Sequence, residues 1–420
     1  MEACGLSFTC ETKCRHSAFR VKWQVWQLKT ILFSITIRPE MKTIRNITLL
    51  LALTLLAFSC KEKETVKAQL QIPAAYDGAG FSTNAATQLA VRQQLAAITD
   101  EAKKGRANGV KLTKTTLDNL FTIGSPSLKS VNTTYFAGKL EGSGGWLDEL
   151  AKASGGTYTP SATVAGNGGT FGTGSGSYLF DENGLEMEQI IEKGQFGSVL
   201  YKHATDLVSA PLTPATADQL VAVFGANPKF PSSSDAVKHP DPDRQMAVYA
   251  ARRDKNDGTG FYTQMKNNFT KLQAALKAGN DYQAEQKEAV EAIKLTWEKV
   301  NAATIINYCH AVIATMSKTA PTDNEKAAAL HAYGESVGFT HGWRTIPQAH
   351  KKITDAQIDE TLVLLNAPAN GTPTSYRFIT DPVTELPKLQ QVITKLKAIY
   401  GFTDQEITDF KTNWVSEQKR

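Results

Sequence analysis

The sequence predicts an all-α protein, an antiparallel helical bundle made of two packed helical subdomains with a long glycine-rich loop. Apolar side chains recur at helical spacing through most of the chain after residue 73, most regularly at 262–276. Helix starts are marked as well, because Thr322 precedes Glu325 by three residues, the spacing of a capping box. No run alternates apolar and polar residues for long enough to predict a strand. These observations favour a bundle over a fold built on a sheet.

Residues 73–226 are expected to form the first subdomain. One helix is expected to end at Gly105, and shorter helices are expected at 117–121 and 146–153. Glycine, threonine and serine dominate the segment 155–176, which predicts a long irregular loop.

A further helix is expected to begin at Asn183, with Glu186 three residues later in a capping-box-like arrangement, and to end before Pro211. It contains Gly194 and Gly197. Each glycine inside a helix costs roughly 1 kcal/mol relative to alanine. We therefore expect a close neighbour at this point, a partner helix first and a ligand as the alternative.

The Pro- and Ser-rich segment 225–243 predicts a boundary, and residues 244–420 are expected to form the second subdomain. The stretch 302–316 has no Lys, Arg, Asp or Glu, which predicts a helix that is buried on most sides. Further helices are expected after residue 322 as far as Arg344, from 382 to Gly401, and from the capping pair Thr403 and Glu406 onward.

Residues 41–59 have the order of a bacterial lipoprotein signal peptide, with a short basic segment before an apolar run at 47–58. The run is too short to span a bilayer, which takes a helix of ~20 residues. Cys60 follows directly, where a lipoprotein receives its diacylglycerol. We therefore expect lipidation at Cys60 and a polar tether at 60–72. Residues 1–40 are expected to be an upstream extension from a misassigned start.

The distribution of charge argues against one class of partner. Residues 1–59 hold eight Lys and Arg but three Asp and Glu, so residues 60–420 carry 38 of each and no formal net charge. The basic balance of the whole sequence gives no reason to expect nucleic-acid binding. The expected partners are the membrane, through the lipid anchor, and other envelope proteins. The expected location is the outer membrane, facing the periplasm or the cell surface.

The segment 330–344 holds the candidate site residues. His331 and Glu335 are four residues apart and share one helix face, a spacing that can hold a metal ion, which is the candidate cofactor. The other interpretation is a His–Glu hydrogen bond in a tightly packed interface, since no third ligand can be named. His341 and Arg344, at the end of the same helix, form a second candidate site.

Gly334, Gly338 and Gly342 form a line along this helix, one turn apart. The cost of three glycines predicts a very close neighbour on that side. The stretch 302–316, which contains small residues, is the expected neighbour. No fingerprint of a hydrolase, a metalloprotease or a nucleotide-binding protein occurs, so no catalytic residue is predicted.

Four phrases of the sequence resemble a lipoprotein family of Bacteroidota, catalogued as domain of unknown function 4856. They are YDGAGFST, DENGLEMEQIIEKGQFGS, WEKVNAATIINY and HAYGESVGF. The resemblance covers nearly the whole chain after Cys60 and implies an outer-membrane lipoprotein without an established activity. The letters CKEKE at Cys60 are similar to the signal that sends such lipoproteins to the cell surface.

A weaker likeness is to imelysin-like envelope proteins, which are α-bundles linked with iron uptake. Their motif, Gly-x-His-x-x-Glu, is nearest to Ala329, His331 and Glu335, where the glycine is missing and the spacing is wider by one residue. This departure puts a peptidase activity and a carried-over metal site in doubt.

The leading expectation is a non-catalytic binding lipoprotein of the cell envelope, linked with metal or haem acquisition. Two alternatives stay open. One is an imelysin-like metallopeptidase or another hydrolase, which needs catalytic groups around His331. The other is a structural surface lipoprotein. A binding protein retains its ligand without turnover, which separates it from the hydrolase.

Overall fold

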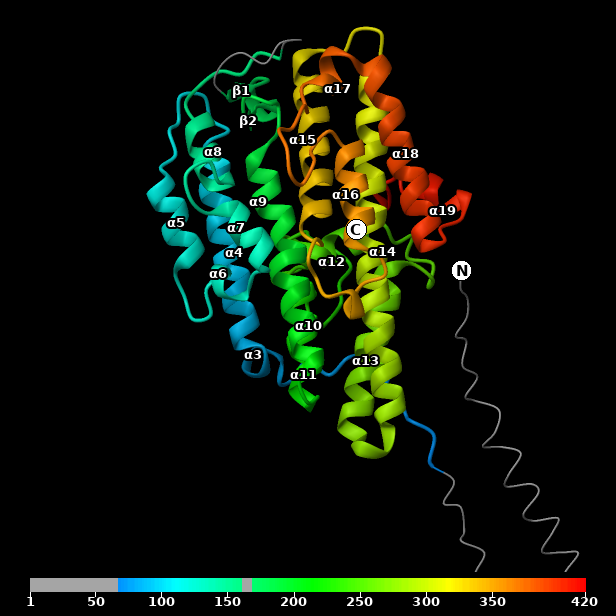
Figure 1. The fold of residues 1–420 in the computed structure, drawn as a ribbon. Coiled ribbons are helices and arrows are strands. Elements are labelled where there is room, and N and C mark those ends of the chain that lie inside the picture. The colour runs from blue at the N-terminus through cyan, green and yellow to red at the C-terminus, as the bar shows by residue number, and fades with distance from the viewer. Residues whose placement is uncertain (1–66, 161–167) are drawn as a thin grey trace, which may run out of the picture. The chain divides into compact units, whose positions relative to one another are not determined.

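The computed structural model describes residues 67–160 and 168–420, and in these residues the protein is an all-α helical bundle, as the sequence predicts (Figure 1). Cys60, the signal peptide, the upstream extension and most of the tether lie outside the described residues. None of the described helices combines the length and the apolarity that a membrane crossing needs.

The helices before residue 230 are α3 (Phe81–Asn84), α4 (Ala86–Lys104), α5 (Lys114–Thr122), α6 (Leu128–Val131), α7 (Thr134–Leu140), α8 (Trp146–Ala153), α9 (Met187–Gln195), α10 (Lys202–Ser209) and α11 (Pro214–Phe224). Those that follow are α12 (Gln245–Arg252), α13 (Phe261–Ala278), α14 (Gln283–Met316), α15 (Asp323–His341), α16 (Asp355–Leu364), α17 (Arg377–Thr380), α18 (Pro382–Tyr400), α19 (Asp404–Asp409) and α20 (Trp414–Glu417).

Capping explains where several of these helices begin. Thr322 accepts from the backbone N of Glu325, while the Glu325 carboxylate accepts from the backbone N of Thr322 at 2.8 Å, so the expected capping box is confirmed at the start of α15. Thr403 and Glu406 form the same box at the start of α19. These bonds satisfy backbone N–H groups that have no partner inside the helix.

A two-stranded hairpin begins inside the expected irregular loop of 155–176 and ends just after it. β1 (Gly169–Phe171) pairs antiparallel with β2 (Tyr178–Phe180). Each strand has three residues, which is too few to show an alternating pattern in the sequence. The sequence-based expectation of no strand was therefore wrong at this point.

The helix expected from Asn183 to Pro211 begins later and is built in three parts. Asn183 lies in the turn after β2, and α9 starts only at Met187. A π-helical segment, Phe196–Tyr201, then separates α9 from α10. π-Helical turns are uncommon and are frequent at functional sites. Here the turn carries Gly197, which lies against the backbone of Gly342.

The helices are packed around α9 and α15. α9 packs against α4 and α8 on one side and against α15 on the other, and α15 packs in turn against α14, which also contacts α13 and α18 (Figure 1). Residues 69–420 form one compact unit. Within this unit α9, from the expected subdomain 73–226, packs on α15, from the expected subdomain 244–420.

The glycine face of α15 lies directly on the backbone of α9. A Cβ added at Gly338 would be 2.6 Å from the carbonyl O of Gln189, and one added at Gly342 would collide with the carbonyl O of Gly194. The expected close neighbour therefore exists, but it is α9 and not the stretch 302–316. α14 packs on α15 elsewhere, where Asn301 Nδ2 donates to the carbonyl O of Phe339 at 3.3 Å.

We expect Gly338→Ala to lower the free energy of unfolding by about 1–3 kcal/mol, because its methyl group must displace a carbonyl of α9. Gly138→Ala, in α7, is the matched control, since a Cβ there meets nothing within 4 Å. That change should be neutral or stabilising by up to about 1 kcal/mol. Urea unfolding of the wild type and both variants measures the difference, and equal effects of the two substitutions would contradict the packing.

Candidate functional site

The contact between α9 and α15 buries a set of charged side chains. Glu186 and Glu188, at the start of α9, are fully buried. Arg106, from the loop after α4, lies between them: its Nη2 is 3.2 Å from Oε1 of Glu186 and donates to Oε1 of Glu188 at 3.0 Å. Breaking such a buried arrangement by removing one partner is strongly destabilising, so Arg106 is needed to hold two carboxylates together out of water.

His331 joins this cluster from α15. Its Nδ1 lies 2.7 Å from Oε2 of Glu186, and its ring stacks on Tyr178 with centroids 4.2 Å apart. Burial alone lowers the pKa of His331, but the charge and the hydrogen bond of Glu186 outweigh it and raise the pKa above its usual value. Burial, with the charge of Glu186, raises the pKa of Glu188 to about 7. The carboxylate partner of His331 is therefore Glu186.

Glu335 has partners of its own. Its Oε1 lies 3.3 Å from Nζ of Lys193 and accepts from the Tyr249 hydroxyl at 3.4 Å. Within the described residues, no three His, Cys, Asp or Glu side chains are grouped so that they could hold a metal ion. The geometry therefore does not support a metal site at His331 and Glu335. His331 pairs with the carboxylate of Glu186, and Glu335 lies beside the ammonium of Lys193.

His341 and Arg344 are brought together by a third residue, Tyr135 of α7. The Tyr135 hydroxyl lies 3.1 Å from Nδ1 of His341, and the Arg344 guanidinium lies over the Tyr135 ring, 4.4 Å from its centroid. Burial, followed by the charges of Lys139 and Arg344, lowers the pKa of His341 to about 3. His341 is therefore a neutral imidazole at physiological pH.

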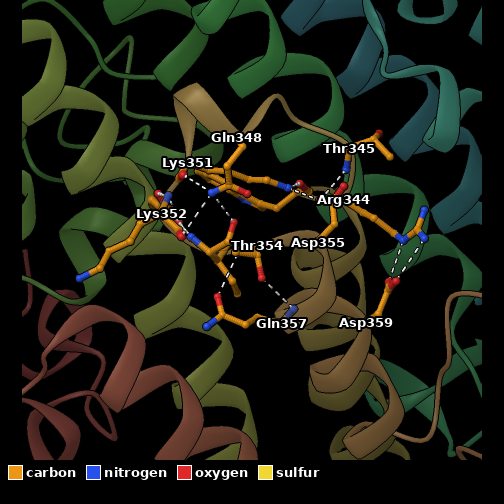
Figure 2. A network of polar contacts seen from close by, with 12 residues as sticks. Arg344, Thr345, Gln348, Lys351, Lys352, Thr354, Asp355, Gln357 and Asp359 are labelled. Atoms are coloured by element: carbon orange, nitrogen blue, oxygen red, sulfur yellow. Dashed lines mark hydrogen bonds and ion pairs between the residues drawn. The ribbon is translucent and has the colours of Figure 1, made fainter. Parts of the chain in front are cut away.

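Arg344 lies in the segment that joins α15 to α16 and is fixed by side chains of α16 (Figure 2). Its Nε donates to Oδ1 of Asp359 at 2.7 Å and its Nη2 to Oδ2 at 3.2 Å, a bidentate pair. The backbone N of Thr345 donates to Oδ1 of Asp355 at 3.1 Å, and Asp355 also pairs with the buried ammonium of Lys351. Arg344 thus supports Tyr135 from a segment that is itself tied down.

His341 also lies in the wall of the loop pocket, the name used here for a cavity of about 500 Å³. The rest of the wall comes from three separate parts of the chain: 138–149 around the α7–α8 connection, 181–187 before α9, and 367–373 after α16. Lys139 Nζ donates to the carbonyl O of Ala369 at 2.7 Å and so joins the first part to the third.

Asp181 forms the second part of this wall. Its Oδ1 accepts from the backbone N of Asn183 at 2.9 Å and of Leu185 at 2.7 Å, which closes the turn between β2 and α9. Gly184 has a φ of +79°, and the Tyr376 backbone would meet any Cβ there. Burial raises the pKa of Asp181 to about 7. A buried carboxyl with such a pKa in a pocket wall is typical of functional sites.

Sequence reasoning did not find the loop pocket, although it named His341. The letters DENG, residues 181–184, are an Asp-initiated turn with glycine at the position that needs a positive φ, and this signal could have identified Asp181. The expected helix start at Asn183 differs from this turn, because the spacing to Glu186 resembles a capping box. No sequence pattern indicated a role for Lys139, because its partner Ala369 is distant in sequence and contributes only a backbone carbonyl.

Comparisons with protein-family models, with curated proteins and with solved structures gave no match for this chain.

We expect Asp181→Asn to change how stability depends on pH. The folded pKa of about 7 lies above the ordinary value of 3.8, so the contribution of Asp181 to stability is complete below about pH 3.8 and is lost as the pH rises through 7. Asparagine keeps the Oδ1 acceptor but cannot ionise.

The free energies of unfolding of wild type and variant should therefore be similar near pH 3.5, and the variant should be the more stable near pH 8. Urea unfolding at both pH values measures the difference. A wild type that gains stability over the variant as the pH rises would contradict the assignment.

Proposed function

We propose that this chain is an outer-membrane lipoprotein, anchored at Cys60, whose helical unit binds a small hydroxyl-rich ligand such as a sugar in the loop pocket without transforming it. The signal-like residues 41–59 and the resemblance to envelope lipoproteins support the location. The loop pocket is the observation that supports binding, because its size of about 500 Å³ is that of a small-molecule site.

The wall of the loop pocket is rich in hydrogen-bond acceptors. It carries four carboxyl side chains, Glu141, Glu149, Asp181 and Glu182. Its one ammonium, on Lys139, is already committed to the carbonyl O of Ala369. Hydroxyl and amino groups donate to such acceptors, whereas an anionic ligand would be repelled. The indole of Trp146 adds an aromatic surface at the same wall.

The inner polar groups of the loop pocket hold the protein together, which favours binding over catalysis. The Asp181 carboxylate closes a turn, and the neutral His341 bonds to Tyr135. The expected link with metal or haem acquisition gains no support from this geometry, because none of these contacts requires a metal.

A hydrolase is the second candidate, and one observation favours it. The pKa of Asp181, raised to about 7 by burial, suits a general acid or base. Glu149, in the same wall, is close enough for its charge to contribute to that shift. The two functions differ in outcome, because a binding protein releases its ligand unchanged whereas a hydrolase converts it.

Titration calorimetry with glucosamine, glucose and glucuronate tests the binding proposal. We expect glucosamine to bind most tightly and glucuronate least, because the wall carries acceptors and negative charge. Glu182→Gln should weaken glucosamine binding two- to fivefold, which corresponds to about 0.5–1 kcal/mol for an exposed charge contact.

Glu417→Gln, an equally conservative change at an exposed position outside the loop pocket, is the control and should leave the affinity unchanged. Preferred binding of glucuronate, or no binding of any of the three sugars, would overturn the proposed ligand class. Recovery of chemically altered sugar after incubation would favour the hydrolase.

The proposed anchor is tested separately in cells. Metabolic labelling with a radioactive fatty acid should mark the wild type and should not mark Cys60→Ala, because the thiol is the acceptor of the diacylglycerol. Cys309→Ala is the matched control: its thiol is buried, burial raises its pKa to about 12, and the labelling should be unchanged. Equal labelling of wild type and Cys60→Ala would rule out this anchor.

A further inference from the structure

The side chain of Arg253 is a buried guanidinium that forms no ion pair within the described part of the chain. In sequence it is distant from the three segments that line the loop pocket. Arg253 follows the last residue of α12, and 7% of its surface is exposed. Its Nη1 donates to the carbonyl O of Phe410 at 2.6 Å, while its Nε has no hydrogen-bond partner. Among the described residues, Arg253 forms no ion pair with an Asp or Glu side chain.

A buried positive charge without a partner lowers the stability of the folded protein. Buried charges are almost always paired, because taking an ion out of water without a partner costs several kcal/mol. Burial lowers the pKa of Arg253 to about 10, with Arg252 adding to the effect, yet a guanidinium with this pKa still carries its charge at neutral pH. The charge of Glu335 acts on Arg253 from farther away and favours the charged form, but no carboxylate of the described residues pairs with this guanidinium directly.

Arg253 lines a cavity of about 160 Å³, called here the Arg253 pocket. Phe261 and Phe410 form an apolar part of its wall, and Gln264 adds an amide. The two rings have centroids 5.9 Å apart, with their planes tilted by 32°. A buried apolar cavity of ~150 Å³ is large enough to bind benzene.

The wall of the Arg253 pocket also carries the ammonium of Lys255 and three carboxylates, each of which already has a partner. Asp409 Oδ2 lies 2.5 Å from Nζ of Lys255. Asp257 Oδ1 accepts from the backbone N of Thr259 at 3.0 Å, and Glu406 Oε2 accepts from the backbone N of Thr403 at 2.7 Å. None of them pairs with Arg253. Because the three carboxylates outnumber the two cations of the wall, an anion must be held by direct contact with Arg253, and a dianion such as phosphate is disfavoured more than a monoanion.

We infer that the Arg253 pocket binds a small monocarboxylate, with its carboxylate on the Arg253 guanidinium and its apolar part against Phe261 and Phe410. The planar fork of arginine matches a carboxylate in two-point geometry. One negative charge neutralises the buried guanidinium, and an apolar body of benzene size fits the volume. This site is independent of the loop pocket, so the failure of either proposal leaves the other standing.

Calorimetry and thermal unfolding of the purified protein with sodium benzoate, sodium acetate and sodium phosphate, each compared with sodium chloride at equal ionic strength, test the inference. Benzoate should bind and raise the melting temperature, acetate should bind more weakly, and phosphate should have no effect beyond chloride. Binding to the folded state alone raises the melting temperature by mass action.

Arg253→Met keeps the length of the side chain and removes the charge. Benzoate binding should weaken at least tenfold, and the variant should melt at a higher temperature than the wild type in chloride, because an unpaired buried charge is gone. The Phe410 carbonyl keeps a partner, since Asn307 Nδ2 also donates to it at 2.6 Å. Lys411→Gln removes an exposed charge near Phe410 in sequence and should leave benzoate affinity unchanged.

Arg253→Lys is a second variant that tests the same site if Arg253→Met does not fold. Lysine keeps the positive charge but lacks the planar guanidinium that can bind a carboxylate at two points. Benzoate affinity should therefore fall measurably, but by less than in Arg253→Met. The inference is overturned if benzoate does not bind the wild type, if benzoate affinity is unchanged in the arginine variants, or if phosphate binds more tightly than benzoate.

Discussion

The glycine face of α15 lies directly on α9, with no side chain of α15 between the two helices. Gly342 lies on Gly194, Gly338 lies on the carbonyl of Gln189, and the other side of Gly194 is filled by the ring of Phe136. α9 is therefore held between α7 and α15 at a distance that only glycine permits. Packing this tight gives strong dispersion contacts but tolerates no added methyl group.

This approach decides where the polar groups lie. Because the two backbones touch, the side chains that flank the glycines are pressed together out of water, and each needs a partner on the other helix. His331 pairs with Glu186 at the start of α9, and Glu335 pairs with Lys193 of α9. Buried pairs of this kind contribute little net stability against apolar residues of the same volume, but losing one partner is severe. We interpret them as fixing the register of α9 on α15.

The sequence predicted the fold class and several helix ends, because capping residues and helical periodicity are local signals. It also predicted a close neighbour for Gly334, Gly338 and Gly342. The predicted neighbour, the stretch 302–316, was wrong. The cost of a glycine in a helix indicates that another part of the chain is close, but it does not indicate which helix that is. The pairing of His331 with Glu186 spans 145 residues of chain, and the loop pocket joins three distant segments. No local pattern reports such contacts, so neither could be predicted.

Native-state hydrogen exchange is the most direct measurement of whether the α9–α15 contact is the centre of the fold. Amides whose hydrogen bonds break only in global unfolding exchange with the full free energy of unfolding, whereas peripheral segments exchange through local opening. The structure predicts that amides of α9 and α15 exchange together with those of α14 at the global limit, while α20 exchanges earlier. Exchange of α9 through local opening, with α14 and α15 still protected, would contradict this account.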